Sequence, residues 1–289
     1  MHDGLAGADG ARARRSGEDT GPRPLIEAAG SVWFSANPDK AWAERYLLAA
    51  SLTWMGAVAI AVLSGWLKSW GESGYLLFST ACAVPMSIVP IVLRARRGSG
   101  VWSSFVVKLN VFVAILVFFG TYVGTHYFFD LMGMRYAFPT RLVFEAALVG
   151  KSGMHVPIFM YPLTQAYFMT YFTALVVADR GLRAKLRLGP IGRASLVLVL
   201  SYAMAFAETF FMATDFMKDL FWYEKHGRML AVGSFGYALY FLFGLPLVRG
   251  LDETADDRFP MGKVVIVALA ACMAIFFGLE AWAKVVGAL

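Results

Sequence analysis

The segment VVIVALAACMAIFFGLEAWAKVV, residues 264–286, decides the fold class. Its charged residues, Glu280 and Lys284, both lie near its end, and the rest is almost entirely apolar. An α-helix of about 20 apolar residues is long enough to cross the roughly 30 Å of hydrocarbon in a bilayer. The segment therefore predicts a transmembrane helix.

Apolar runs of similar length recur along the chain, at 46–67, 75–93, 104–128, 155–178, 195–214 and 229–248. Of the 289 residues, 58% are hydrophobic and 16% are charged, whereas a soluble protein carries about a quarter of its residues as charges. The mean hydropathy is +0.60. These features predict an all-α, polytopic integral membrane bundle with about seven transmembrane helices.

The two ends of the chain differ in composition. Residues 1–30 are rich in Gly, Ala, Arg and Asp, and we expect a disordered polar arm there. We expect residues 31–289 to form a single transmembrane domain, with 31–45 at the membrane interface through Trp33 and Trp42. The loops that share a side with the N-terminus hold about twice as many Lys and Arg as the others, which predicts a cytoplasmic N-terminus. The net charge of +6 then follows from membrane topology and predicts no nucleic-acid partner.

No sequence signature of a cofactor or a metal site is recognisable. A Gly-rich phosphate loop, a His-rich box, a haem or flavin motif and a nucleophile elbow are all missing from the sequence. Cys82 and Cys272 lie inside apolar runs and are expected to be buried. We therefore expect no cofactor and no metal, and any enzyme chemistry to be acid–base chemistry on a lipid.

Glu208 is the most informative polar residue inside an apolar run. A charged side chain at the centre of a membrane helix costs at least about 2.5 kcal/mol, so its presence needs a reason. Ser201, Glu208 and Asp215 recur every seven residues and are predicted to share one helix face. In apolar surroundings the carboxyl is expected to stay a neutral acid, ready to donate a proton. The alternative is a neutral carboxyl that joins two helices by a hydrogen bond.

A second candidate stripe consists of Tyr122, His126 and Asp130, which are spaced four residues apart. Such a phenol, imidazole and carboxylate on one helix face form a plausible proton relay. The alternative is a polar cluster at the end of a helix. We also expect Lys108 to reach toward the interface, and the acidic run Asp252 to Asp257 to be a solvated loop.

Several of these residues also carry a resemblance to a known family. The matching residues run from about 37 to 286 and include the specific blocks Thr125–Phe129 and Leu200–Tyr202 with Glu208-Thr209. Other matching positions are Asn37, Pro38, Lys40, Trp42, Ala83, Val84, Pro85, Pro90, Lys108, Asn110, Gly120, Tyr122, Gly133, Tyr136, Phe138, Pro139, Val156, Pro157, Tyr237, Ala238, Tyr240, Phe241, Pro246, Arg249, Asp252 and Glu253. On these residues the sequence resembles the cycloeucalenol cycloisomerase family, whose members open the 9β,19-cyclopropane ring of a sterol to give a Δ8 sterol.

The resemblance implies a cofactor-free isomerase of the cycloeucalenol-to-obtusifoliol type. Opening the ring requires protonation of a strained C–C bond, a cation at C9 and loss of the C8 proton. Glu208 is then expected to be the acid, and His126 with Tyr122 and Asp130 the base, although these two assignments are interchangeable. The residues expected to bind or orient the substrate are Ser201, Thr209, Tyr127, Tyr202 and Asn110, and aromatic rings are expected to shield the cation.

Other functions remain compatible with the same residues. A non-catalytic sterol- or lipid-binding membrane protein would use the same aromatic cavity, and a sterol double-bond isomerase would need similar acid–base groups. The expected partners are a cyclopropyl sterol and membrane lipid. The expected location is the cytoplasmic membrane of a bacterium or the endoplasmic reticulum of a eukaryote, and the sequence does not determine the oligomeric state.

Overall fold

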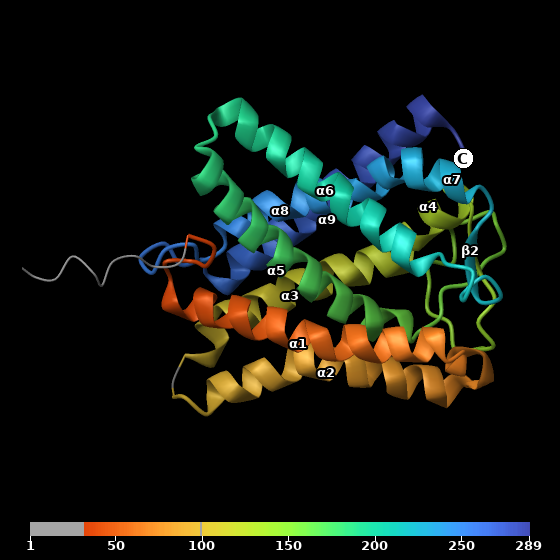
Figure 1. Cartoon of the computed structure of the whole chain (residues 1–289), viewed down its shortest axis with the longest axis horizontal. Coiled ribbons are helices and arrows are strands. Elements are labelled where there is room, and N and C mark those ends of the chain that lie inside the picture. Colours follow the sequence, from red (N-terminus) through yellow and green to blue (C-terminus); the bar gives the residue numbers. More distant parts are fainter. Residues whose placement is uncertain (1–31, 99) are drawn as a thin grey trace, which may run out of the picture. The chain divides into compact units, whose positions relative to one another are not determined.

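A computed structural model describes residues 32–98 and 100–289 (Figure 1). Within this part, seven long helical segments account for most of the chain. They are α1 (Pro38–Leu63), α2 (Glu72–Ala95), α3 (Phe105–Phe119) continued through η3 (Gly120–Gly124) and α4 (Thr125–Asp130), α5 (Met160–Leu186), α6 (Pro190–Met212), α7 (His226–Arg228) continued through η4 (Met229–Gly233) into α8 (Ser234–Gly250), and α9 (Met261–Val286). Two short 3₁₀ turns, η1 (Trp66–Ser69) and η2 (Val101–Ser103), follow α1 and α2.

The predicted all-α membrane bundle is confirmed. In the described part of the chain, 6 helical segments are long and apolar enough to cross a membrane. They are α1, α2, α3 with α4, α6, α7 with α8, and α9. The seventh, α5, is 27 residues long but carries Asp179 and Arg180 in its last turns and is less apolar. The predicted polar arm, residues 1–30, lies outside the described residues, and the division into domains stays a prediction.

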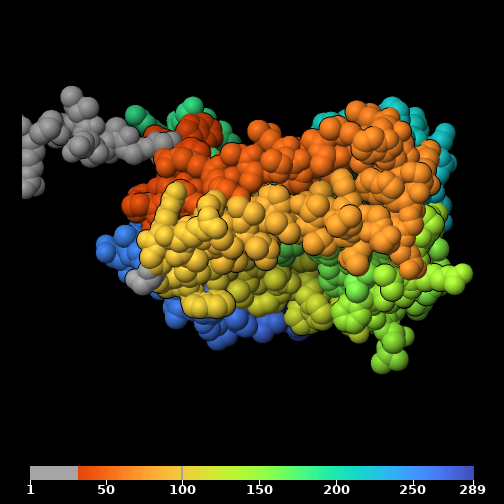
Figure 2. All heavy atoms as spheres, turned by 90° about the horizontal axis from the view of Figure 1, so that it is seen from below, coloured from red at the N-terminus to blue at the C-terminus, as the bar shows by residue number. Residues whose placement is uncertain are grey.

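The helices form three groups (Figure 1). In that view α1 and α2 lie along one side, α6, α8 and α9 along the other, and α3 and α5 between them. Accordingly α2 and α1 pack on α5, α6 packs on α8, and α9 packs on both α3 and α8. The side of α1 and α2 is covered by their closely packed side chains (Figure 2). Because α3 and α5 contact both outer groups, they form the centre of the bundle.

α1 begins earlier than predicted. Asn37 caps it by accepting a hydrogen bond from the backbone N–H of Asp39 at 3.0 Å, and Pro38 occupies the first turn. The first long helix therefore starts at Pro38 and not near residue 46, and the interfacial position of residues 31–45 stays a prediction. Lys40 and Glu44 lie on its inner face with 0% and 1% exposure, since each has an ionic partner inside the bundle.

Lys40 closes the C-terminal end of α8. Its ammonium donates hydrogen bonds to the carbonyls of Val248, Arg249 and Leu251 at 3.2, 2.8 and 2.7 Å. The last carbonyls of a helix have no partner within the helix, so one buried lysine satisfies groups that would otherwise be orphaned. The same ammonium pairs with Glu253 at 2.8 Å. Lys40 of α1 therefore joins the end of α8 by hydrogen bonds and the segment after α8 by an ion pair.

Three further ion pairs extend this cluster. Arg180 on α5 bridges Glu253 at 2.6 Å and Glu44 at 2.8 Å. Lys108 on α3 pairs with Asp252 at 2.6 Å, and both side chains are 2% exposed. The predictions of a lysine reaching toward the interface and of a fully solvated acidic loop are therefore wrong at Lys108, Asp252 and Glu253. Lysines and arginines contributed by three separate helices draw these two acids inward, whereas Asp256 and Asp257 stay exposed.

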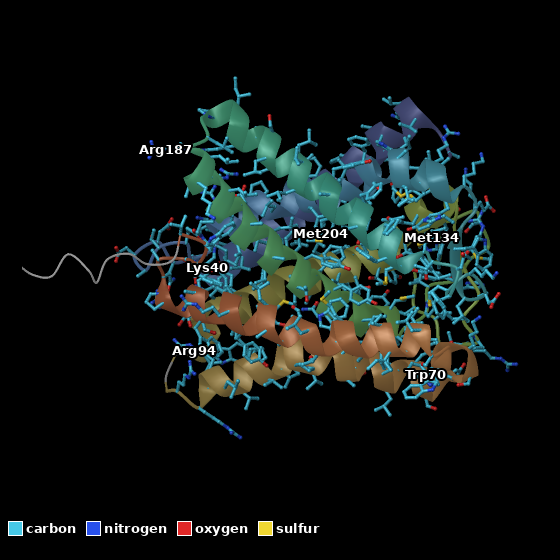
Figure 3. All side chains as sticks on the ribbon, in the orientation of Figure 1. Lys40, Trp70, Arg94, Met134, Arg187 and Met204 are labelled. Carbon is cyan, nitrogen blue, oxygen red and sulfur yellow. The ribbon has the colours of Figure 1, made fainter. Side chains whose placement is uncertain are left out.

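The charged cluster lies at one end of the bundle. Figure 3 shows Lys40, Arg94 and Arg187 at this end, and Trp70 and Met134 at the other. The arrangement agrees with the distribution of basic residues in the sequence. Membrane orientation itself stays a prediction.

Low pH is expected to reduce the stability of this end of the molecule because Glu253 becomes protonated. Burial alone would raise the pKa of Glu253, but hydrogen bonds from Arg180 and the charge of Lys40 outweigh burial and lower it. A carboxyl whose pKa is lowered on folding stabilises the fold above its unfolded pKa and loses that contribution as pH falls through the folded value. Thermal stability of the purified protein should therefore decline below about pH 4.3, the usual pKa of a glutamate. A Glu253→Gln variant should show a smaller decline, and an identical profile would contradict this role.

Candidate active site

A cavity lies between the helices at the end of the bundle away from the charged cluster. Its volume is about 190 Å³, more than ten times the roughly 10–15 Å³ that one water needs. Residues from α1, α2, α3, α5, α6 and α8 line it, and most are aliphatic or aromatic. Such a hollow, largely apolar with a few polar groups, is typical of a small-ligand site.

A short antiparallel sheet closes part of this cavity. β1 (Met134–Tyr136) pairs with β2 (Phe221–Tyr223), with Tyr136 opposite Phe221. Side chains alternate along a strand, and here Met134 and Tyr136 of β1 and Phe221 and Tyr223 of β2 line the cavity. The sequence analysis missed this sheet because each strand has only three residues. Trp222, Tyr223 and Tyr136 are aromatic residues, which favour strands, and were the sequence features that could have indicated the sheet.

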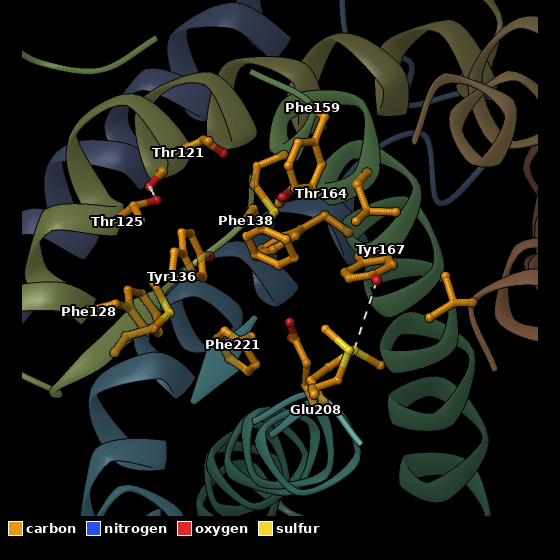
Figure 4. Close-up of a pocket in the computed structure, with 18 of the residues that line it drawn as sticks. Thr121, Thr125, Phe128, Tyr136, Phe138, Phe159, Thr164, Tyr167, Glu208 and Phe221 are labelled. Atoms are coloured by element: carbon orange, nitrogen blue, oxygen red, sulfur yellow. Dashed lines mark hydrogen bonds between the residues drawn. The ribbon is translucent and has the colours of Figure 1, made fainter. Parts of the chain in front are cut away.

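Glu208 provides the carboxyl group among the described residues that line the cavity. It lies near the end of α6, and Figure 4 shows it pointing into the space bounded by Phe221, Phe138 and Tyr167. Tyr237 of α8 donates a hydrogen bond to its Oε2 atom, and Tyr171 of α5 is a second hydrogen-bonding neighbour. No lysine, arginine or histidine is among the described residues that line the cavity. Because a charge without a partner is costly away from water, these surroundings favour the neutral acid.

The packing of α6 explains why Glu208 faces inward. Val197, Ser201, Ala205 and Thr209 recur every four residues and are all buried. This stripe packs mainly on α8, since α6 and α8 are in extensive contact. Glu208 precedes the last buried residue of the stripe and so lies at its edge, where the cavity begins. α6 ends at Met212, so the predicted helical stripe does not extend to Asp215.

His126 does not line the cavity. Its ring is buried, with its Nε2 atom 3.9 Å from a carboxylate oxygen of Glu145 and no hydrogen-bond partner at either ring nitrogen. A methyl group built on Gly150 would collide with this ring, so the 145–150 segment covers it closely. His126 therefore faces the loop that precedes α5, whereas its neighbour Thr125 faces the cavity.

The two residues predicted to assist His126 have other contacts. Asp130 accepts hydrogen bonds from the backbone N–H groups of Lys151 and Ser152 at 2.9 and 2.8 Å, which anchors the same loop. Tyr122 stacks on Phe118 with ring centroids 5.5 Å apart. Neither lines the cavity. The helical stripe exists, but it faces the loop and not the cavity.

The predicted substrate-binding residues also lie outside the cavity lining. Tyr127 donates to Glu280 of α9 at 2.6 Å, and Asn110 donates to the carbonyl of Val106 at 2.9 Å. The hydroxyl of Tyr202 is 3.3 Å from the carbonyl of Ala231. Ser201 and Thr209 are buried in the stripe of α6, and the Thr209 hydroxyl donates to the carbonyl of Ala205. Of the nine predicted site residues, the structure brings Glu208 alone to the cavity.

Hydroxyl groups make up the rest of the polar lining. They belong to Thr121, Thr125, Thr164, Tyr75, Tyr136, Tyr167, Tyr223, Tyr237 and Tyr240. Burial raises the pKa of Tyr136 and of Tyr223. These two phenols therefore stay neutral. No cluster of three or more His, Cys, Asp or Glu side chains suited to a metal occurs in residues 32–98 and 100–289.

Two glycines in η3, Gly120 and Gly124, leave space for the ring of Tyr240 in the cavity wall. η3 is a π-helical turn, a local widening of a helix that is frequent at functional sites. A methyl group added at Gly124 would collide with the Tyr240 hydroxyl, and one at Gly120 would lie 3.0 Å from its ring. Gly124 therefore permits a close approach between α3 and α8.

A Gly124→Ala substitution is expected to force Tyr240 out of this position. Overpacking of this kind costs about 1–3 kcal/mol, so thermal stability should fall and ligand binding in the cavity should weaken. Gly56→Ala in α1 is the matched control, because nothing lies within 4 Å of the added methyl group. The control should leave stability unchanged or slightly raised. Equal melting temperatures for the two variants would contradict the proposed contact.

Comparison with known proteins adds a relative that matches nearly the whole chain. It is a curated protein of Arabidopsis thaliana, cycloeucalenol cycloisomerase, 29% identical over 265 residues, which cover 89% of this chain and 90% of the relative. The chain resembles cycloeucalenol cycloisomerase. The resemblance seen in the sequence motifs is therefore confirmed. No protein-family model matches the chain, and no solved structure matches it.

Many positions on which the resemblance to cycloeucalenol cycloisomerase was identified lie at the cavity. They are Gly120, Thr125, Phe128, Tyr136, Phe138, Glu208, Tyr237 and Tyr240. They come from η3, α4, the β1 region, α6 and α8. Residues far apart in the sequence thus meet around one hollow.

Proposed function

We propose that this protein opens the 9β,19-cyclopropane ring of a cyclopropyl sterol without a cofactor. The observation that carries the proposal is the carboxyl of Glu208, the one carboxyl among the described residues that line a largely apolar and aromatic cavity within a membrane bundle. The similarity to the Arabidopsis cycloeucalenol cycloisomerase supports a sterol isomerase in particular. The substrate and the surrounding membrane lipid are the proposed partners.

The chemistry begins with Glu208. Its proton adds to C19 of the cyclopropane, the C9–C19 bond supplies the electron pair for the new C–H bond, and a cation forms at C9. Loss of the C8 proton then gives the Δ8 double bond. The sterol keeps its elemental composition, so no oxidant, reductant or metal is required.

Aromatic rings around Glu208 suit the cationic intermediate. Phe138, Phe221 and Tyr167 surround the carboxyl in Figure 4, and their faces carry partial negative charge. They stabilise a cation but do not attack it, whereas water or a nucleophilic side chain would trap it as an alcohol or adduct. The hydrogen bond from Tyr237 holds the Glu208 carboxyl in place and stabilises the carboxylate after proton transfer.

Turnover by membranes that contain the full chain tests the proposal. The membranes are incubated with cycloeucalenol, cycloartenol and a Δ8 sterol without a cyclopropane ring, with no added cofactor. Gas chromatography with mass spectrometry is expected to detect a ring-opened isomer of unchanged mass from at least one cyclopropyl sterol and no change in the third sterol. Membranes from the same host without the protein are the control. Binding of the sterols without conversion would instead indicate a sterol-binding protein, and a shifted double bond in the third sterol would indicate a double-bond isomerase.

A further inference from the structure

The second proton transfer needs a base, and the cavity offers few. Apart from Glu208, the polar side chains among the described lining residues are threonines and tyrosines, together with the thioethers of the methionines. A neutral hydroxyl is a weak base, because accepting a proton makes it an oxonium ion. The carboxylate left by the first step is therefore the strongest base in the described lining.

The groups that face Glu208 from the neighbouring elements are phenols. Those that interact electrostatically with it are Tyr136 of β1, Tyr167 and Tyr171 of α5, Tyr223 of β2 and Tyr237 of α8. Burial raises the pKa of Tyr136 and Tyr223, so neither exists as a phenolate that would take up a proton.

His126 directly follows Thr125, which lines the cavity, but the His126 ring does not face the cavity. The titratable group that faces it is Glu145, at 3.9 Å, which also pairs with His155 at 2.7 Å. Phe129 contacts the ring edge-on, and Gly150 lies close against it. The helix backbone of α4 thus separates the imidazole from the cavity-facing side chains of Thr125 and Phe128.

We infer that Glu208 performs both proton transfers, giving its proton to C19 and then taking the proton from C8. The inference rests on the proposed function. In step one the carboxylic acid loses its proton to C19 and becomes a carboxylate as the C9–C19 bond breaks. In step two the C8–H electron pair forms the C8=C9 bond, and the proton returns to the carboxylate. Acid and sterol regain their starting proton counts, so no co-reactant is needed.

The geometry of the substrate class is compatible with one catalytic group. In a 9β,19-cyclosterol the cyclopropane methylene projects from the β face, and the usual C8 hydrogen lies on the same face. C19 of the methylene and C8, which carries this hydrogen, are both bonded to C9. A carboxyl positioned over that face therefore reaches both without a shift of the ligand, which agrees with the presence of one carboxyl in the described lining.

The rate of ring opening as a function of pH tests the inference on the unmodified protein. A histidine base must be neutral, so activity would fall as pH drops through about 6.5. A single carboxylic acid must be protonated at the start, so activity should not fall as pH is lowered and should decline only as pH is raised. An acid limb near pH 6.5 would overturn the inference.

A His126→Gln variant provides a second, independent test of the inference. Its turnover should stay within about threefold of the unmodified protein, whereas loss of a true base costs about a hundredfold or more. A hundredfold loss in a variant with an unchanged melting temperature, together with a larger rate effect of deuterium at C8, would assign the second step to His126. If the unmodified protein converts no cyclopropyl sterol, the proposed function itself fails, and that outcome is distinct from either of these.

Discussion

Glu208→Gln is expected to lower the rate of ring opening by at least about a hundredfold, because general acid–base catalysis contributes about 10²–10⁴-fold and the amide has no acidic proton. The amide has nearly the same shape, and its oxygen still accepts the hydrogen bond from Tyr237. Membrane insertion and stability should therefore be preserved. The measurement is the initial rate of product formation in membranes, normalised to the amount of protein.

Glu280→Gln is the matched control for this experiment. Glu280 is also a carboxyl within a transmembrane helix, but it accepts a hydrogen bond from Tyr127 and does not line the cavity. Its amide variant should keep ring-opening activity within a few-fold of the unmodified protein. Equal activity of Glu208→Gln and the unmodified protein would remove Glu208 from the reaction, whereas equal loss in both variants would point to a general effect on the bundle.

Asp252→Asn is expected to lower the stability of the protein strongly. Asp252 pairs with Lys108 at 2.6 Å, and both side chains are almost completely buried. Breaking a buried pair by removing one charge costs about 3–5 kcal/mol, because the other charge stays behind without compensation. Asparagine keeps the size of the side chain and tolerates the left-handed backbone at this position, where φ is 48°. Thermal unfolding in detergent should show a clear drop in melting temperature.

Two comparisons separate this effect from a general effect of the loop. Asp256→Asn changes an exposed acid four residues away and should leave the free energy of unfolding within about 0.5 kcal/mol of the unmodified protein. A Lys108→Met/Asp252→Asn double variant should recover much of the lost stability, since it removes both charges. If the double variant is no more stable than Asp252→Asn, the ion pair is not the source of the loss.

The helical architecture was predictable because the lipid environment requires it. Apolar runs near 20 residues long predicted the long helices, and Glu208 stood out because a carboxyl is costly in such a run. The starts of the helices were less predictable. α1 extends back to Pro38 because Lys40 finds partners at the end of α8 and in the segment after it, and Glu44 finds one on α5. These contacts are distant in sequence.

The grouping of site residues was only partly predictable. Spacing along one helix correctly placed Tyr122, His126 and Asp130 on a stripe, but spacing does not say what the stripe faces. That depends on the 145–152 segment, which covers His126 and is anchored by Asp130. The phenols around Glu208 come from β1, β2, α5 and α8, so the arrangement exists only after these elements pack together.

The buried charges and the cavity occupy opposite ends of one bundle (Figure 3). The ion pairs of Lys40, Lys108 and Arg180 join α1, α3, α5 and the segment after α8 at a distance from the cavity. Substitutions in the aromatic wall can therefore change the shape of the hollow while the far end still holds the helices in register. Sequence divergence should accordingly alter the ligand preference of the cavity before it destabilises the scaffold.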